Sequence, residues 1–192
     1  MVRHRSFDQG QVLAGAMHAF RRKGYTAVSI RDLEAATGLT SGSIYNAFGD
    51  KDGLFRAALD FYVGGFVRER IERFAGPSAR LEDLEQLYLT IFAPPLDDGF
   101  GCLVTNSMVE FGREDAPSSP SVAEVDAMLR ASIGGVLSRE IGEGGAAVML
   151  PRLILLYHGV LVMSRAGRLD PAARDAIAAQ FAEIRALRAV GS

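Results

Sequence analysis

The sequence predicts an all-α protein of about nine helices, in which a small three-helix head precedes a larger helical body. Three observations predict this class. Apolar residues recur at helical spacing along most of the 192 residues. Strand signals are nearly absent, because no sustained alternation and no Asn-Gly or Asp-Gly turn lies between apolar runs. Apolar residues make up 48% of the chain, which is enough for a packed core and argues against disorder.

The head is expected to hold three short helices with polar caps and glycine stops. The first spans about residues 7–23 and ends at Gly24. Ser29 caps the second helix, with an acidic residue three positions later in a capping-box arrangement, and Gly38 ends it. Thr40 caps the third helix, which closes at the sequence Ala-Phe-Gly. The glycines and caps therefore divide this region into a compact helical unit.

The body is expected to hold six further helices. They span about residues 51–74, 80–92, 102–113, 121–141, 146–166 and 170–190, with the sequence GEGG as the turn before the fifth of them. Two adjacent glycines, Gly64 and Gly65, lie inside the first of these helices. Because each costs about 1 kcal/mol relative to Ala, they need a reason. Two explanations are open: close packing against a neighbouring helix, or a pivot between two bodies.

The segment SIRDLEAATGLTSGSIYNAF, residues 29–48, joins two short helices through a glycine-containing turn and predicts a helix-turn-helix. In that motif the second helix enters the major groove of DNA. Small residues such as Ser41 and Gly42 allow the backbone to approach the duplex, and free N–H groups at the helix start attract phosphate. Asn46 suits a base edge, whereas Tyr45 and Lys51 suit phosphates.

The charge distribution agrees with a DNA-binding head. The net charge of the whole chain is −2. Residues 1–60 hold eight Lys or Arg against six Asp or Glu, a net +2, whereas residues 61–192 hold thirteen against seventeen, a net −4. Any surface for a polyanion is therefore expected at the N-terminal end.

The stretch TAVSIRDLEAATGLTSGSIYNAFGDKDGLFRAAL resembles the DNA-binding head of the tetracycline-repressor (TetR) family of bacterial transcription regulators. The resemblance covers about residues 7–60, and it implies a DNA-binding domain over 1–50 and an effector-binding and dimerisation domain over 51–192. It also implies a homodimeric repressor that binds a palindromic operator and responds to a small organic effector. The predicted DNA-binding residues are Ser29, Thr40, Ser41, Gly42, Tyr45, Asn46 and Lys51. Many members carry Lys or Arg at the position of Ser41, so the base preference does not follow from the resemblance.

The last two helices are the candidates for a dimer interface. The helix over 146–166 is apolar almost all round, and the helix over 170–190 places Ala173, Ile177 and Phe181 on one stripe. Members of the resembled family typically dimerise through a four-helix bundle of these two helices from each chain. Burial within the monomer is the alternative explanation of the same pattern.

Aromatic and polar residues on the middle helices are the candidates for an effector site. Family members typically enclose a ligand cavity there, coupled to the head by the fourth helix, and an apolar pocket with a few polar groups suits a small organic molecule. The alternative is an ordinary core. The predicted effector-binding residues are Tyr62, Phe66, Tyr88, Cys102, Asn106, Glu110 and His158.

Cys102 has two possible roles. The segment GCLVTNSMVE resembles one found in a subset of the family, in which some members sense electrophiles or oxidants through this cysteine. A helix N-terminus lowers the pKa of a thiol, whereas apolar burial raises it, and the nearby Asp97 and Asp98 disfavour a thiolate. The alternative is a small buried hydrophobic residue.

An enzyme is not expected, because the chain contains no G-x-S-x-G, P-loop, G-x-G-x-x-G or HExxH motif. A dyad of Cys102 and His158 is conceivable, yet nothing in the sequence orients it. One Cys and three scattered His give no zinc spacing, so neither a metal nor another cofactor is expected. A helical interaction module that does not bind DNA is the other alternative class. It would not need polar groups such as Tyr45, Asn46 and Lys51 on a slim helix.

A cytoplasmic location without membrane contact is expected. The single cysteine allows no intrachain disulfide, and no apolar stretch follows the basic N-terminus as in a signal peptide. The longest apolar run, residues 148–163, is interrupted by polar residues and is shorter than the roughly 20 residues that a membrane helix needs.

Overall fold

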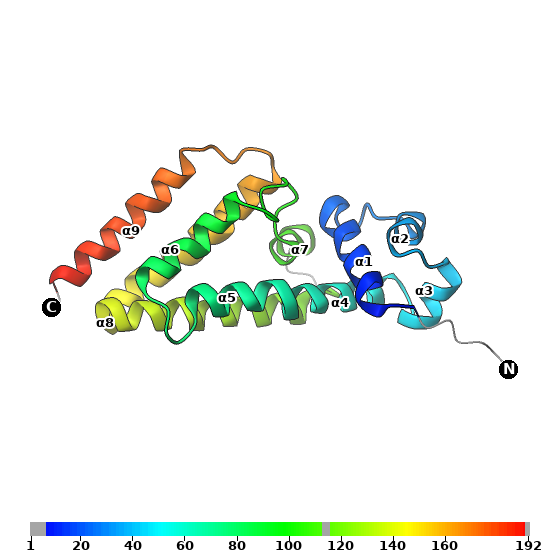
Figure 1. The fold of residues 1–192 in the computed structure, drawn as a ribbon, viewed down its shortest axis with the longest axis horizontal. Helices are drawn as coiled ribbons and strands as arrows, with labels where there is room; N and C mark the ends of the chain where they lie inside the picture. Colours follow the sequence, from blue (N-terminus) through cyan, green and yellow to red (C-terminus); the bar gives the residue numbers. More distant parts are fainter. Residues whose placement is uncertain (1–6, 113–115, 191–192) are drawn as a thin grey trace.

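The computed structural model describes residues 7–112 and 116–190, and within them it contains helices and no strand, which confirms the predicted all-α class. The elements are α1 (Gln9–Lys23), α2 (Ile30–Thr37), α3 (Ser41–Phe48), α4 (Lys51–Tyr62), the π-helix η1 (Val63–Val67), α5 (Arg68–Ala75), α6 (Leu81–Leu89), the 3₁₀ helix η2 (Thr90–Phe92), α7 (Leu103–Phe111), α8 (Ser119–Arg165) and α9 (Ala173–Val190). Helices α1 to α3 form the head, and α4 leads from it into the body (Figure 1).

The caps of the head lie where the sequence predicts them. Asp8 accepts hydrogen bonds from two N–H groups at the start of α1, and Ser29 forms the capping box of α2. Thr40 caps α3, and Gly38 adopts a left-handed conformation with φ of 70° between the two helices. Under these helices lies a core of fully buried side chains, Phe20, Leu33, Ile44, Leu54 and Phe55. Local caps and this core together hold the short helices in place.

Gly15 brings α1 and α2 into close contact. A Cβ atom at this position would lie 2.1 Å from the carbonyl oxygen of Ala36, well inside the contact distance of the two atoms. Only glycine fits without a shift of one backbone. The turn between α2 and α3 therefore has a fixed distance from α1.

The helix predicted over residues 51–74 is continuous but not uniform. It consists of α4, the wide π-helical turn η1 and α5, which together form one long rod along the lower edge of the molecule (Figure 1). Gly64 and Gly65 lie in η1, are exposed, and have no neighbouring atom within 4 Å of an added Cβ. The explanation of these glycines by close packing is therefore wrong. The pivot explanation stays a prediction.

The two helices predicted over 121–141 and 146–166 form α8, which changes direction at a single residue. Gly142 has φ 73° and ψ 166°, outside the helical region, and the two arms of α8 run in different directions (Figure 1). The expected four-residue turn is thus one residue long, because Gly144 and Gly145 already continue the helix. Gly142 supplies the positive φ that other residues rarely adopt.

The body packs α5, α6 and α9 against α8. Its core includes Tyr88, Leu153 and Phe181, all fully buried. By length and composition alone, α8 could cross a membrane, a test that the core helix of a soluble protein also passes, and 39% of its most apolar window is buried inside the chain.

Arg21 of α1 attaches the head to the body. Its buried guanidinium donates to the carbonyl oxygens of Gly101 (2.6 Å) and Pro95 (2.8 Å) and forms a two-pronged ion pair with Asp98 (2.7 and 2.8 Å). All three partners lie in the loop between η2 and α7. A buried, bidentate arginine of this kind fixes the orientation of two segments. Head and body are therefore connected both through α4 and through this loop.

Candidate DNA-binding surface and effector site

Helix α3 places its polar side chains outward. Ile44 is fully buried and anchors the helix, whereas Gly42 and Asn46 are exposed and the Tyr45 side chain is 49% exposed. A large aromatic side chain left half in solvent on a short polar helix is unusual for a core helix, and it fits contact with a partner. The helix thus presents the slim outer face that the sequence predicts.

The backbone N–H groups at the start of α3 have more hydrogen-bond partners than expected. Glu34 Oε1 accepts a hydrogen bond from the Ser41 N–H at 2.6 Å, and Thr40 Oγ1 accepts one from the Ser43 N–H at 3.3 Å. The expectation of free N–H groups at this end is therefore wrong for Ser41 and Ser43. Protein side chains satisfy these donors because a helix N-terminus attracts an acidic or hydroxyl group from its own chain.

Ser29 has a structural role in the capping box. Its N–H and its hydroxyl both donate to Asp32 Oδ2, at 2.9 and 2.8 Å, and its Oγ accepts from the Asp32 N–H. Asp32 also pairs with Lys23 at 2.6 Å, and the hydrogen bonds from Lys23 and Ser29 hold the pKa of Asp32 well below its ordinary value. These contacts fix the start of α2, and a DNA contact by Ser29 stays a prediction.

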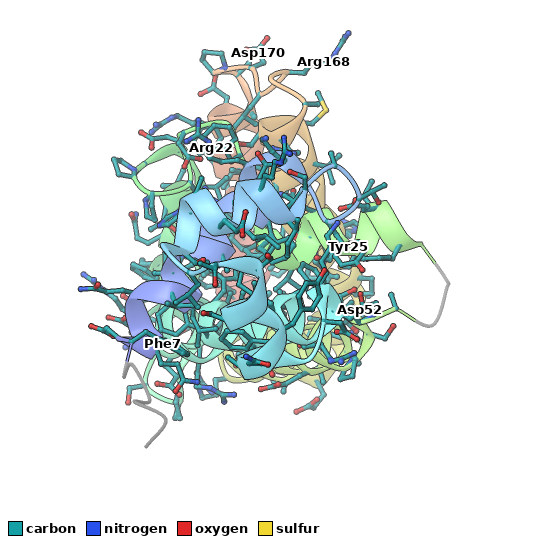
Figure 2. The ribbon with its side chains drawn as sticks, turned by 90° about the vertical axis from the view of Figure 1, so that its right-hand side faces the viewer. Phe7, Arg22, Tyr25, Asp52, Arg168 and Asp170 are labelled. Carbon is teal, nitrogen blue, oxygen red and sulfur yellow. The ribbon has the colours of Figure 1, made fainter. Side chains whose placement is uncertain are left out.

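Lys51 lies against an aromatic side chain of the head. Its Nζ is 4.5 Å from the centre of the Tyr25 ring, and the Tyr25 hydroxyl donates a hydrogen bond to Asp52, which lies beside it at the start of α4 (Figure 2). Burial, followed by this hydrogen bond, raises the pKa of Tyr25 to about 12. The cation–π contact holds the ammonium group of Lys51 over the Tyr25 ring, where its charge also helps to lower the pKa of Glu110, and a phosphate contact by Lys51 stays a prediction.

The structure does not bring the seven predicted effector residues into one site. Tyr88 is fully buried, and its hydroxyl donates to the Leu153 carbonyl at 2.9 Å, so it belongs to the core. Glu110 accepts hydrogen bonds from the N–H groups of Tyr25 (2.9 Å) and Thr26 (2.7 Å) and connects α7 to the head. Burial alone would raise the pKa of Glu110. The hydrogen bonds from Tyr25 and Thr26 together lower it by more than burial raises it, so the pKa lies below the ordinary value.

Asn106 and Glu110 line a cleft of about 250 Å³ where head and body meet, together with Lys23, Gly24, Val109, Val162 and Arg165. Asn106 Nδ2 donates to the Phe100 carbonyl at 2.8 Å, so this amide also supports the loop before α7. His158 faces Thr105, with 3.3 Å between Nδ1 and Oγ1. Asn106 and Glu110 thus line the cleft between head and body, whereas Tyr88 belongs to the core of the body.

Tyr62, Phe66 and Cys102 form a second group inside the body. The rings of Tyr62 and Phe66 are 5.3 Å apart, and the buried Cys102 thiol at the start of α7 lies beside the Tyr62 hydroxyl. Burial and then the neighbouring Cys102 raise the pKa of Tyr62 well above its ordinary value. The negative charge of Asp98, expected to act on Cys102, is compensated by Arg21.

Sequence reasoning missed Arg70, which joins this second group. The guanidinium is buried, donates to the Tyr157 hydroxyl at 3.1 Å, and lies with its Cζ 5.4 Å from the centre of the Phe66 ring. The spacing Tyr62, Phe66, Arg70 was the available signal, because positions four apart share one face of a helix. Arginine is mostly exposed in proteins, so this signal favours the surface unless the face is already assigned to the interior.

Comparison with known proteins gives consistent results. Residues 12–58 match the model of "Bacterial regulatory proteins, tetR family". The chain is 33% identical over 138 residues to the HTH-type transcriptional repressor Rv1474c of Mycobacterium tuberculosis, covering 71% of this chain and 68% of that protein. It is 27% identical over 145 residues to the HTH-type transcriptional repressor ComR of Escherichia coli, covering 74% and 69%.

Solved structures share the fold over nearly the whole chain. The TetR-family regulator SCO4454 of Streptomyces coelicolor has a TM-score of 0.78 at 20% identity, with 96% of both chains covered. A cysteine mutant of the TetR-family regulator CifR, in complex with 26-base-pair operator DNA, has a TM-score of 0.68 at 28% identity, with 97% of this chain and 98% of that chain covered. The helical body as well as the head thus has known counterparts.

Proposed function

We propose a mechanism by which this chain recognises its operator DNA and is released from it. The chain belongs to the TetR family of bacterial regulatory proteins and is a DNA-binding transcriptional repressor. Residues 1–50 bind DNA, and residues 51–192 bind an effector and dimerise. The observation that carries the proposal is the outer face of α3, with Tyr45 half exposed above the buried Ile44. A cytoplasmic location is part of the proposal, since that is where bacterial operators lie.

In the proposed complex, α3 lies in the major groove. Asn46 reads a base edge, whereas the hydroxyl of Tyr45 and the ammonium group of Lys51 contact phosphates. Thr40, Ser41 and Gly42 lie at the end of α3 that approaches the backbone of the duplex. Glu34, whose carboxylate accepts the Ser41 N–H, repels a phosphate placed directly on the helix axis and so favours a phosphate to one side.

Dimerisation uses α8 and α9. Three apolar side chains of α8 repeat every seven residues and face solvent in the single chain: Val148 is 54%, Leu155 74% and Val162 38% exposed. On α9, Leu187 is 40% exposed. An apolar stripe at this spacing favours a partner helix, and a palindromic operator requires two heads about one helical turn of DNA apart. The partner is therefore a second copy of this chain.

Release follows from a two-state coupling between the body and the heads. The rod of α4, η1 and α5 connects the interior of the body with the head, and Arg21 connects α1 with the loop before α7. An effector that favours a different position of this rod changes the distance between the two α3 helices. The affinity for the operator then falls.

The test of DNA recognition is selection of an operator from a randomised DNA pool, followed by fluorescence anisotropy. Wild-type protein is expected to bind the selected site with an affinity that falls steeply as salt rises. Tyr45→Phe is expected to bind several-fold more weakly and to unfold at the wild-type temperature, because the hydroxyl is exposed. Unchanged affinity would remove Tyr45 from the contacts, and failure to select any sequence would contradict the proposal.

The test of dimerisation is Leu155→Asp, with Val109→Asp as its control. Both residues are exposed apolar side chains, but Val109 lies on α7 outside the stripe. Leu155→Asp is expected to sediment as a monomer and to lose operator binding, and Val109→Asp is expected to stay a dimer. A dimeric Leu155→Asp variant would show that another surface holds the two chains together.

A thiol sensor at Cys102 is the second candidate mechanism of release. Cys102 is buried, which favours the role of a small hydrophobic residue, and an electrophile would need an opening of the loop before α7 to reach the thiol. The test is operator release by a thiol-reactive electrophile, compared between wild type and Cys102→Ser. Release of wild type alone would establish the sensor, and equal responses would establish a structural cysteine.

A further inference from the structure

The guanidinium of Arg70 is a buried cation whose hydrogen-bond partners are all neutral. The residue is only 9% exposed. Its Nη1 donates to the Tyr157 hydroxyl at 3.1 Å, and its Nη2 donates to the Leu87 carbonyl at 2.9 Å and to Thr90 Oγ1 at 2.7 Å. Among the described residues no carboxylate pairs with it. A buried charge without a counterion is costly, so such a group is a strong site for an anion.

Arg70 Nε has no hydrogen-bond partner in the described part of the chain, and the Tyr62 hydroxyl has only the weakly polar Cys102 thiol beside it. Tyr62 is 4% exposed, so neither atom is compensated by bulk solvent. Buried donors without partners are rare in folded proteins and call for an explanation. A hydrogen-bond acceptor bound beside Arg70 Nε would satisfy this donor.

The side chains of Tyr62 and Arg70 both lie close to one aromatic ring, that of Phe66. The Phe66 ring is 5.3 Å from the Tyr62 ring and 5.4 Å from Arg70 Cζ. The three residues are spaced four apart along the rod, with Tyr62 beside Cys102 and Arg70 bonded to residues of α6, η2 and α8. This arrangement offers a cation and a hydroxyl at the two ends of an apolar surface.

The backbone between these donors is the π-helical turn η1, Val63–Val67. A π-helical turn inside an α-helix is frequently found at a functional site, and loss or gain of its extra residue rotates the part of the helix beyond it. The exposed glycines of this turn have no neighbouring atom that would resist such a change. The rod therefore has an adjustable point directly beside Arg70.

We propose that Arg70 is the recognition group for a small organic carboxylate, which accepts hydrogen bonds from Arg70 Nε and places its apolar part on Phe66, within reach of the Tyr62 hydroxyl. The inference rests on the proposed function, because this carboxylate is the effector that releases the operator. A planar guanidinium fits a carboxylate, and the apolar surroundings favour one negative charge over the several of a phosphate ester. Binding adjusts η1 and so shifts α4 and the head.

Thermal unfolding of the DNA-free protein tests the inference. The probes are hexanoate, benzoate and succinate, each compared with its neutral amide. At a concentration roughly 100-fold above its Kd, a carboxylate that binds is expected to raise Tm by about 5 °C or more. The amides are expected to leave Tm unchanged. If no carboxylate raises Tm, or if the amides act equally, the inference is wrong.

Arg70→Gln and Arg73→Gln form a matched pair one turn apart. Arg73 is exposed on α5, so Arg73→Gln is expected to keep the full Tm response, whereas Arg70→Gln is expected to lose it.

Tyr62→Phe tests the same site if Arg70→Gln fails to fold. It removes an unpartnered hydroxyl, so the variant is expected to fold normally and to bind the carboxylate several-fold more weakly. An unaltered response in Tyr62→Phe would contradict the role of this hydroxyl, and an unaltered response in a folded Arg70→Gln would overturn the inference.

Operator binding is measured separately on the same samples. A protein that binds the selected operator but no carboxylate would refute the carboxylate effector alone. A protein that binds a carboxylate but no DNA would refute the proposed function alone. Release of the operator by the same carboxylate that raises Tm is the expected result.

Discussion

The head and the body of this molecule use polar side chains in opposite ways. In the head, the functional candidates Tyr45 and Asn46 point outward from a short helix, and local caps satisfy the backbone beneath them. In the body, the groups with unpaired donors, Tyr62 and Arg70, point inward from a long rod. The polar groups of the head thus face solvent, where DNA is bound, whereas those of the body face the interior, where we propose that an effector binds.

This difference explains how the two regions can communicate. A surface site needs a rigid frame, which Gly15 and the caps supply. The proposed interior site requires a segment that can adjust, and we propose η1 for this role because its glycines have open space around them. The contacts between them, above all those of Arg21, then decide how far a change inside the body reaches the head. The following experiments change the contacts of Arg21, the close approach of α1 and α2 at Gly15, and the glycines of η1.

The largest effect is expected from Arg21→Met. The substitution leaves Asp98 and two carbonyl groups without their partner, which is expected to reduce the free energy of unfolding by about 3 kcal/mol. Chemical denaturation measures it. Arg22→Met is the matched control, because Arg22 is exposed and only covers the Phe100 ring, 5.0 Å away. Equal losses in the two variants would contradict the role of Arg21.

Gly15→Ala is expected to destabilise the head by about 2 kcal/mol, because the added Cβ overlaps the Ala36 carbonyl and pushes α2 away from α1. Operator binding is expected to weaken as well, since α3 follows α2. Denaturation and anisotropy measure the two effects. Gly42→Ala has open space around its Cβ and serves as the stability control. A stable Gly15→Ala variant would show that the two helices can separate without cost.

The double variant Gly64→Ala, Gly65→Ala is expected to raise the free energy of unfolding by about 2 kcal/mol, since both positions are helical, exposed and without neighbours. The stiffer rod is expected to respond less to an effector, with little change in affinity for the operator. Anisotropy with and without effector measures the response. An unaltered response would remove η1 from the coupling and leave Arg21 as the connection.

His158 predicts a small dependence of stability on pH. Burial lowers its pKa below the ordinary value of 6.5, so the folded chain resists a proton that the unfolded chain accepts. The stability that depends on the neutral imidazole is therefore complete well above pH 6.5 and is lost as the pH falls below that value toward the lowered pKa of the folded chain. His158→Asn is expected to remove this loss, and His18→Asn, an exposed histidine, is expected to keep it. Equal pH profiles for His158→Asn and wild type would contradict the assignment.

The head could be predicted from the sequence almost residue by residue. Ser29, Gly38 and Thr40 cap helices through hydrogen bonds to residues a few positions away, and such local interactions can be predicted from a single sequence. The occupied N–H group of Ser41 was missed because its acceptor Glu34 lies on another helix, whereas the bond from the Ser43 N–H to Thr40 follows from the predicted cap. Even in the head, then, contacts between elements were harder to predict than the elements.

The body was predicted as a set of helices but not as a site. Tyr88 and Glu110 were chosen as polar or aromatic residues on the right helices, yet one is core and the other connects α7 to the head. Arg70 and Arg21 were missed because their burial depends on partners 17 to 87 positions away. Residue type and spacing do not indicate which residues far apart in the sequence lie next to each other in the fold. The π-helical turn likewise looks like ordinary α-helix in the sequence.

The contacts of Arg21 also limit how regulators of this kind can be recombined. A chimera that joins this head to a foreign body at residue 50 would keep Arg21 but lose Asp98 and the Pro95 and Gly101 carbonyls, and it would lose Glu110 beneath Tyr25 and Thr26. The grafted head would then be covalently attached but mechanically uncoupled. A chimera that keeps these contacts between head and body must carry residues 95–110 together with the head. The structural unit to be transplanted is therefore discontinuous in sequence.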